Sequence, residues 1–119
     1  MNFKAFYPVN KAYKCNIPRD RIILDPGIGF GKNTEESLQL INRLPGLFSL
    51  QLPVLVGTSR KSFIGKVLDR PIGERLLGTL ASSIVAILNG AHILRVHDVE
   101  EVGIAVKMVD AITAESLPQ

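Results

Sequence analysis

The length, composition and charge of this chain limit it to one globular domain at most. It has 119 residues, of which 46% are hydrophobic and 21% are charged, and this balance excludes an intrinsically disordered chain. The net charge of +3 is small and no run of five or six basic residues concentrates it, so we expect no nucleic-acid partner. No stretch reaches the roughly 18 apolar residues of a membrane span, and residues 1–15 lack the apolar segment of a signal peptide. We therefore expect a cytoplasmic protein that makes no membrane contact.

Three short apolar segments are predicted to be strands, and a helical pattern follows each of them. The segments are 21–25 (RIILD), 53–57 (PVLVG) and 92–96 (HILRV). After the first, Asn33 and Glu36 form the pattern of a capping box at a helix start. Pro45 and Gly46 are expected to end the regular turns of that helix. Its apolar residues at helical spacing are Leu40, Ile41, Leu44, Leu47 and Phe48.

Two helical segments are predicted after the second strand, and one after the third. A short one ends near Leu68, and a longer one spans 74–89 with Gly90 as its C-terminal cap. The last helix is predicted to start at Asp98, with Glu101 completing a capping box. The expected buried stripes are Leu77, Leu80, Ile84, Ile87 and Leu88 on the longer helix, and Val102, Ala105, Val106, Val109 and Ile112 on the last.

This alternation predicts an α/β fold with a parallel sheet that helices cover on both faces. Because the carboxyl ends of parallel strands open on one side, the loops DPGIGFGKN, GTSRKS and RVHDV should converge there. Polar residues in these three loops are therefore the candidate ligand contacts.

The glycine-rich loop that follows Asp25 matches neither common nucleotide motif. Its glycines at 27, 29 and 31 alternate, whereas a dinucleotide fingerprint needs G-x-G-x-x-G, and Asn33 stands where a P-loop has Ser or Thr. The loop could be simply a tight turn from strand to helix, because glycine readily adopts positive φ. Asp25 favours a functional reading, since a carboxylate at the end of a buried strand must be paired or hydrogen-bonded.

The other two loops carry cations. Arg60 and Lys61 could be an ordinary surface pair, but they follow a buried strand and precede Ser62 at a predicted helix start, a position that favours anions. Arg95 lies at the end of an apolar strand, which suggests an anionic ligand or a carboxylate partner. His97 could be only a loop histidine. The single cysteine, Cys15, cannot form an intrachain disulfide, and two histidines make no zinc-like cluster, so we expect no metal ligands in this chain.

Three segments resemble, in order, the C-terminal half of the bacterial dihydropteroate synthases: ILDPGIGFGK, PVLVGTSRKSFIG and ERLLGTLASSIVAILNGAHILRVHDV. The resemblance runs from about residue 17 to about residue 112. It implies the last three βα units of a TIM (β/α)8 barrel, incomplete as given. Residues 17–119 would form the C-terminal part of a pterin-binding barrel domain, and residues 1–16 a segment of unclear role.

The resemblance also implies an activity. These enzymes are transferases of folate biosynthesis and the target of sulfonamides. They condense 6-hydroxymethyl-7,8-dihydropterin diphosphate with p-aminobenzoate to give 7,8-dihydropteroate and diphosphate. Magnesium assists departure of the diphosphate, and its ligand is expected in the N-terminal half that this chain lacks. We expect a homodimer for the complete protein and no synthase activity for the isolated chain.

Six residues receive roles from the resemblance, and three of them, Lys61, Arg95 and His97, are the expected catalytic residues. An alternative is a related barrel that binds a pterin or methyltetrahydrofolate without synthase activity. Such a module has no diphosphate to bind and would not need those three residues together. The expected contacts are Asp25 and Lys61 with the pterin, Phe30 and Ser62 with p-aminobenzoate, and Arg95 and His97 with the diphosphate.

Overall fold

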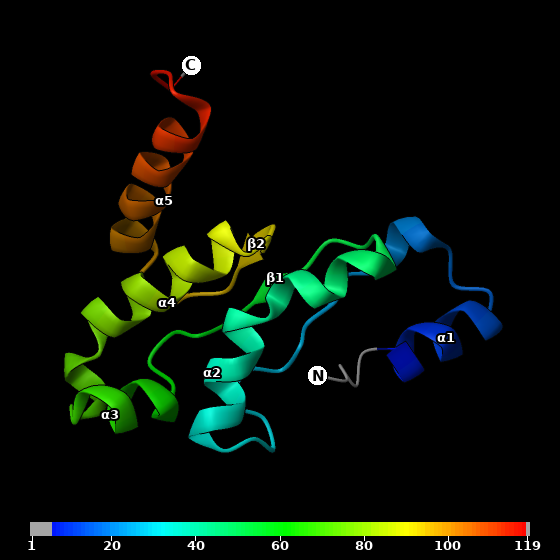
Figure 1. Ribbon diagram of the computed structural model, residues 1–119, viewed down its shortest axis with the longest axis horizontal. Coiled ribbons are helices and arrows are strands. Elements are labelled where there is room, and N and C mark those ends of the chain that lie inside the picture. The colour runs from blue at the N-terminus through cyan, green and yellow to red at the C-terminus, as the bar shows by residue number, and fades with distance from the viewer. Residues whose placement is uncertain (1–5, 119) are drawn as a thin grey trace.

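The computed structural model describes residues 6–118 and shows an α/β chain that spreads over 43 × 39 × 22 Å (Figure 1). Its two strands lie at the centre, while α1 and α5 extend from opposite sides. The strands are β1 (Leu55–Val56) and β2 (Ile93–Leu94), and the 3-10 helices are η1 (Arg19–Arg21), η2 (Leu44–Leu50) and η3 (Ile72–Glu74). The α-helices are α1 (Phe6–Lys14), α2 (Thr34–Asn42), α3 (Ser62–Leu68), α4 (Leu76–Leu88) and α5 (Val99–Ala114).

The sheet is parallel, as predicted, but shorter than predicted. Leu55 pairs with Ile93 and Val56 with Leu94. The expected strand at 21–25 is wrong in extent, because η1 includes Arg21 and only Leu24 joins the sheet, through a parallel bridge to Val54. Pro26, which lacks an N–H donor, cannot extend that bridge. The three extended segments lie along the sheet in chain order, with residues 54–56 between Leu24 and β2.

Helices do not cover both faces of this short sheet, which corrects a second expectation. Ile23 is 55% exposed and Ile93 37% exposed, whereas Leu24, Val54 and Val56 are buried. Because side chains alternate between the two faces of a strand, one set packs into the core and the other set is exposed on the opposite face of the sheet. The hydrophobic core lies between these inward residues and helices α2, η2, α3 and α4. Its members include Ile28, Leu40, Ile41, Leu44, Leu47, Phe63, Ile64 and Ala86.

The start of α2 follows the sequence prediction in detail. The Asn33 side chain accepts the Glu36 N–H at 2.8 Å, and the Glu36 carboxylate accepts the Asn33 N–H at 3.1 Å. This capping box places the glycine-rich loop directly before a fixed helix end. Of the apolar residues expected to be buried here, Phe48 is instead 54% exposed, since η2 turns it toward Gly90.

The buried face of α4 is not the predicted apolar stripe. Leu77 is 77% exposed and Leu88 60% exposed. The face turned inward carries small and hydroxyl side chains because it lies against Thr58, whose buried hydroxyl needs partners. The Ser82 hydroxyl donates to Thr58 Oγ1 at 2.9 Å, and Ser83 Oγ lies 3.3 Å from the same atom. The buried residues of α4 are Thr79, Ser83 and Ala86.

Two expectations about α5 are also wrong. Only Val102 of its predicted face is fully buried, and Ile112 is 62% exposed, because α5 leaves the body of the chain beyond its first turns (Figure 1). Asp98 makes no side-chain cap, since its carboxylate is bound by Arg60 instead. The glycine cap of α4 is confirmed: Gly90 has φ +105° and donates to the Ile87 carbonyl. Within residues 6–118, no helix is both long and apolar enough to cross a membrane.

Candidate functional site

The glycine-rich loop needs its glycines for their backbone conformation. Gly27, Gly29 and Gly31 have φ of +73°, +85° and +61°, in the region that other residues rarely adopt. Asp25 starts the turn, because its Oδ1 accepts the Gly27 N–H at 2.9 Å. The Asp25 side chain is exposed rather than buried, and the Gly27 N–H supplies the hydrogen bond that the sequence prediction required of its carboxylate. The other carboxylate oxygen has no hydrogen-bond partner among the described residues.

Lys61 lies across this loop and connects it to the loop after β1. Its Nζ donates to the Ile28 carbonyl and lies 5.0 Å from the centre of the Phe30 ring. A Cβ on Gly29 would lie 3.2 Å from Lys61 Cδ, so the glycine provides room for the lysine stem. Partial burial lowers the pKa of the Lys61 ammonium, and the nearby Arg95 charge lowers it further, while Asp25 opposes both effects. The two neighbouring positive charges of Lys61 and Arg95 therefore favour the binding of a negatively charged group.

A cavity of about 230 Å³ joins Lys61 to the loop after β2. Arg95 and His97 line it together with Lys61, and the cavity wall also includes Gly57, Ser59 and Val96. The Arg95 guanidinium packs against Gly57, where an added Cβ would lie 3.2 Å from Nη2. Two cations and an imidazole facing one small cavity form a site suited to an anion with several oxygen acceptors.

A second cavity of about 220 Å³ shares Lys61 with the first. Phe30 and Ser62 line it with Lys61, and Ile28 and Gly29 complete it. Phe30 is 66% exposed and presents its ring to this space. Lys61 is thus the shared wall of an aromatic cavity and a cationic one. The structure brings the predicted residues Phe30, Lys61 and Ser62 together, and Lys61, Arg95 and His97 together.

Sequence reasoning missed the contacts that hold the two loops in place. Arg60, which the sequence grouped with Lys61 as a candidate anion contact, instead donates from Nη2 and Nε to the two carboxylate oxygens of Asp98, at 2.8 and 3.3 Å. This pair lowers the pKa of the Asp98 carboxyl and raises that of Arg60, chiefly through the hydrogen bonds. Arg60 has φ +57°, and its N–H donates to the buried Thr79 hydroxyl at 3.1 Å. A positive φ at a residue other than glycine has no local sequence signal, and neither has a partner 38 residues away, so the sequence could not predict these contacts of Arg60.

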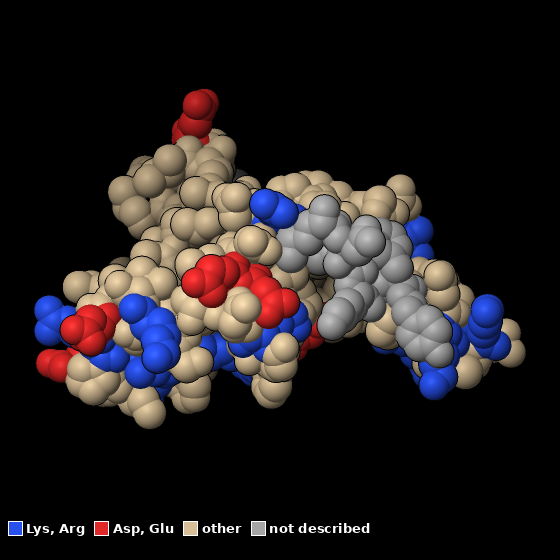
Figure 2. Space-filling model, turned by 60° about the horizontal axis from the view of Figure 1, so that its bottom comes forward, with Lys and Arg blue, Asp and Glu red and all other residues tan. Residues whose placement is uncertain are grey.

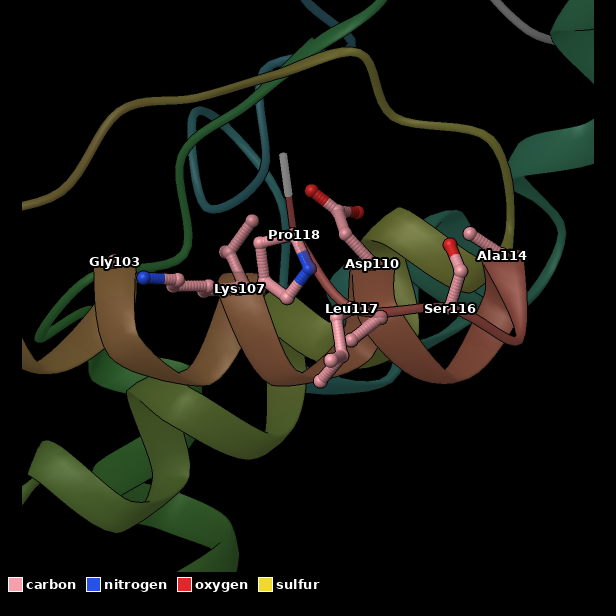
Figure 3. Close-up of a pocket in the computed structure, with 9 residues that line it drawn as sticks. Gly103, Lys107, Asp110, Ala114, Ser116, Leu117 and Pro118 are labelled. Atoms are coloured by element: carbon pink, nitrogen blue, oxygen red, sulfur yellow. The ribbon is translucent and has the colours of Figure 1, made fainter.

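A larger cavity of about 480 Å³ lies elsewhere, along α5 (Figure 3). Ser116, Leu117 and Pro118 turn back beside the helix and form one wall, and Lys107 and Asp110 belong to the other. It contains none of the predicted site residues. We therefore assign the site to the two cavities that contain the predicted residues.

The charged surface near the site is mixed in sign. On the face in Figure 2, Lys and Arg side chains around α2 and α3 alternate with Asp and Glu, and a separate basic group lies at the α1 end. Within residues 6–118, no three His, Cys, Asp or Glu side chains are grouped as metal ligands would be. The part of the chain that the structure describes therefore offers no ready-made cluster of carboxylate ligands for magnesium.

Comparison with known proteins shows that most of the chain is similar to pterin-binding enzymes. The family model for pterin binding enzymes matches residues 6–97. The chain is 53% identical over 105 residues to a dihydropteroate synthase of Synechocystis and 44% identical over 103 residues to that of Escherichia coli K12. Each match covers 87% of this chain and 36% of the relative, so the chain spans about a third of their length. A solved dihydropteroate synthase of Xanthomonas albilineans in complex with 7,8-dihydropteroate superposes with a TM-score of 0.87 at 37% identity, covering 92% of this chain and 45% of that one.

Proposed function

Because this chain belongs to the family of pterin-binding enzymes, we propose that it is part of a dihydropteroate synthase. Such an enzyme would join 6-hydroxymethyl-7,8-dihydropterin diphosphate to p-aminobenzoate and release diphosphate. One observation carries the proposal: Lys61 separates a cationic cavity from an aromatic one, so a single lysine can contact both halves of the reaction. The relative from Xanthomonas albilineans, solved with 7,8-dihydropteroate, supports the same substrate class.

The pterin is proposed to lie over the glycine-rich loop, between Asp25 and Lys61. The exposed Asp25 carboxylate offers acceptor oxygens for the N–H edge of a 2-amino-4-oxo heterocycle. The Lys61 ammonium, held by the Ile28 carbonyl, retains further donors for the ring carbonyl. Both groups bind and orient a flat polar ring beside a backbone without bulky side chains.

Arg95 and His97 are proposed to bind the diphosphate and to stabilise it as it leaves. In the reaction the carbon–oxygen bond to the diphosphate breaks, and negative charge accumulates on the departing oxygen. Arg95 and Lys61 line the cavity that would receive this charge, and His97 adds an imidazole. The amine of p-aminobenzoate then forms the new carbon–nitrogen bond and loses a proton. We propose the Phe30 ring and the Ser62 hydroxyl as the contacts of p-aminobenzoate, a position at which sulfonamides would compete.

We infer that the complete protein closes this chain into a TIM barrel, with residues 17–119 as its last three βα units. Such a barrel would continue at the two free strand edges, beside Leu24 and beside β2, and the exposed side chains of Ile23 and Ile93 would then face its interior. Helix α1 packs Val9 into the same core, so this part of the segment 1–16 belongs to the domain. Magnesium is proposed to bind through residues outside this sequence. A cytoplasmic location is part of the same proposal.

We also propose a homodimer for the complete protein, through the outer faces of α4 and α5. On α5 the side chains of Ile104, Met108 and Ile112 follow one another at helical spacing, and each is more than 60% exposed. Leu77 and Leu88 add exposed apolar area on α4. Contiguous apolar surface of this kind commonly marks an interface, and a second copy offers the matching face.

The alternative is a barrel that binds methyltetrahydrofolate without synthase activity. A protein that binds methyltetrahydrofolate has no diphosphate to bind, so it would not need two cations and an imidazole around one cavity. The cationic cavity of Lys61, Arg95 and His97 therefore favours the synthase.

A synthase assay on two proteins tests the proposal. The 119-residue chain should show no turnover with both substrates and magnesium. A chimera in which this sequence replaces the matching third of a dihydropteroate synthase should be active, within the roughly 1 to 10³ per second of ordinary enzymes. A folded chimera that binds the pterin diphosphate but makes no dihydropteroate would overturn the proposed function.

A further inference from the structure

Ser59 makes a contact to His97 that the proposed function does not use. Ser59 is only 6% exposed, and its hydroxyl lies 2.8 Å from His97 Nδ1 and 3.1 Å from the His97 backbone nitrogen. One buried hydroxyl therefore contacts both the ring and the backbone of a residue 38 positions away. Such a double contact fixes the orientation of the ring with respect to the cavity.

The hydrogen atoms of this contact can be assigned by elimination. A backbone N–H can only donate, so Ser59 Oγ accepts from His97 N–H. Oγ has a second lone pair and could also accept Nδ1–H, but the buried hydroxyl hydrogen would then have no acceptor among the described residues. Nδ1, 2.8 Å away, is the acceptor that this hydrogen has, and it accepts as a neutral ring. The proton of the neutral imidazole must in that case reside on Nε2. From this geometry we propose that Ser59 is a positioning residue, which holds His97 as the Nε2–H tautomer and directs that N–H as a donor toward the anion cavity.

This role rests on the proposed function, because a fixed donor is useful only if an anion binds there. His97 and Ser59 line the same cavity as Lys61 and Arg95, and Asp98 next to His97 is already bound by Arg60. A bare Nε2 facing the cavity would repel oxygen acceptors, whereas Nε2–H donates to them. The hydroxyl thus converts a ring that could donate or accept into one that donates.

The second histidine provides an internal reference. His92 Nδ1 accepts the Val54 backbone N–H at 3.1 Å, so its ring is also fixed with Nδ1 as acceptor. That partner is a backbone group on another segment and does not involve Ser59. A change at Ser59 should alter His97 and leave His92 unchanged.

The first test measures the tautomers in the full chain without ligand. Nitrogen-15 NMR, at a pH where both rings are neutral, distinguishes the protonated ring nitrogen from the bare one. In Ser59→Ala, the preference of His97 for Nε2–H should fall by about 2- to 12-fold, the range that one neutral hydrogen bond supplies. Ser37→Ala is the control, because it removes an equally buried hydroxyl that has no partner among the described residues. An unchanged His97 tautomer ratio in Ser59→Ala would overturn the proposal.

The second test asks whether Ser59 acts through His97. Calorimetry with inorganic diphosphate, in the chimera described above, should show about 2- to 12-fold weaker binding for Ser59→Ala. Ser59→Thr, which keeps the hydroxyl, should restore the affinity. In a His97→Ala background the Ser59→Ala change should have no further effect, since its only route has been removed. The same loss in both backgrounds would refute a positioning role. Failure of the unmodified chimera to bind diphosphate would refute the proposed function instead, and the ligand-free spectra would still decide the role of Ser59.

Discussion

Removing the Arg95 guanidinium should weaken binding of the pterin diphosphate and leave binding of a pterin without diphosphate nearly unchanged. Arg95 lines the cationic cavity and lies against Gly57. Its side chain donates no hydrogen bond to another residue within 6–118, so Arg95→Ala leaves no protein group unpaired. The loss of affinity should therefore report the ligand contact itself.

The expected magnitudes differ between Arg95 and Lys61. A charge-assisted hydrogen bond contributes about 1.5–3 kcal/mol, which corresponds to roughly 10- to 150-fold in affinity. Arg95→Ala should show this loss for the diphosphate form alone. Lys61→Ala should show it for both ligands, because Lys61 binds the Ile28 carbonyl and thereby also holds the loop beneath the pterin. The approach of Lys61 to the Phe30 ring stabilises the loop itself by about 0.5–1 kcal/mol, so its loss should lower the stability of the loop.

Calorimetry on the chimera, with 6-hydroxymethylpterin and with its diphosphate, measures both effects. Lys66→Ala is a matched control, because it removes one exposed positive charge from α3 without changing either cavity. If Arg95→Ala weakened the two ligands equally, the assignment of Arg95 to the diphosphate would be wrong. If Lys61→Ala weakened only the diphosphate form, Lys61 would not contact the pterin.

Three further predictions concern the fold. The 119-residue chain should elute as oligomers in size-exclusion chromatography at micromolar concentration, because its strand edges and the outer faces of α4 and α5 are open, and a clean monomer would contradict this. Gly78→Ala should lower the free energy of unfolding by about 1–3 kcal/mol, since the new Cβ would lie 2.3 Å from Ile64 Cγ2. Gly103→Ala should raise the free energy of unfolding by about 0.5–1 kcal/mol, because no atom lies within 4 Å of the new Cβ and alanine favours the helix. Thermal unfolding of both variants measures these changes, and equal effects would refute the packing argument. The Arg60 pair lowers the pKa of Asp98, so its stabilisation is present above the ordinary carboxyl pKa and disappears as pH falls through the lowered value. Asp98→Asn should therefore lower the melting temperature at neutral pH and match the unmodified chain in strong acid, and a difference that persists in strong acid would count against the pair.

Several features could be predicted from the sequence because short-range interactions decide them. The capping box of Asn33 and Glu36 joins residues three apart, and the alternating glycines adopt positive φ within a single turn. The alternation of apolar segments with helical patterns also determined that the sheet is parallel and that three polar loops lie on one side of it. Since each loop follows its own strand, the approach of Lys61 to Arg95 and His97 follows from this topology.

Only the tertiary structure decided which surfaces and partners these segments use. The apolar stripe of α4 predicted a buried face, but the hydroxyl of Thr58 needs partners, so the serines face inward and Leu77 faces out. Asp98 had the local pattern of a helix cap, yet Arg60, 38 residues away, binds its carboxylate. Periodicity records which side chains are apolar, but it contains no information about what covers them. A hydrogen bond between residues far apart in sequence depends on the relative positions of two loops in the folded chain. The sequence pattern around either residue alone does not determine those positions.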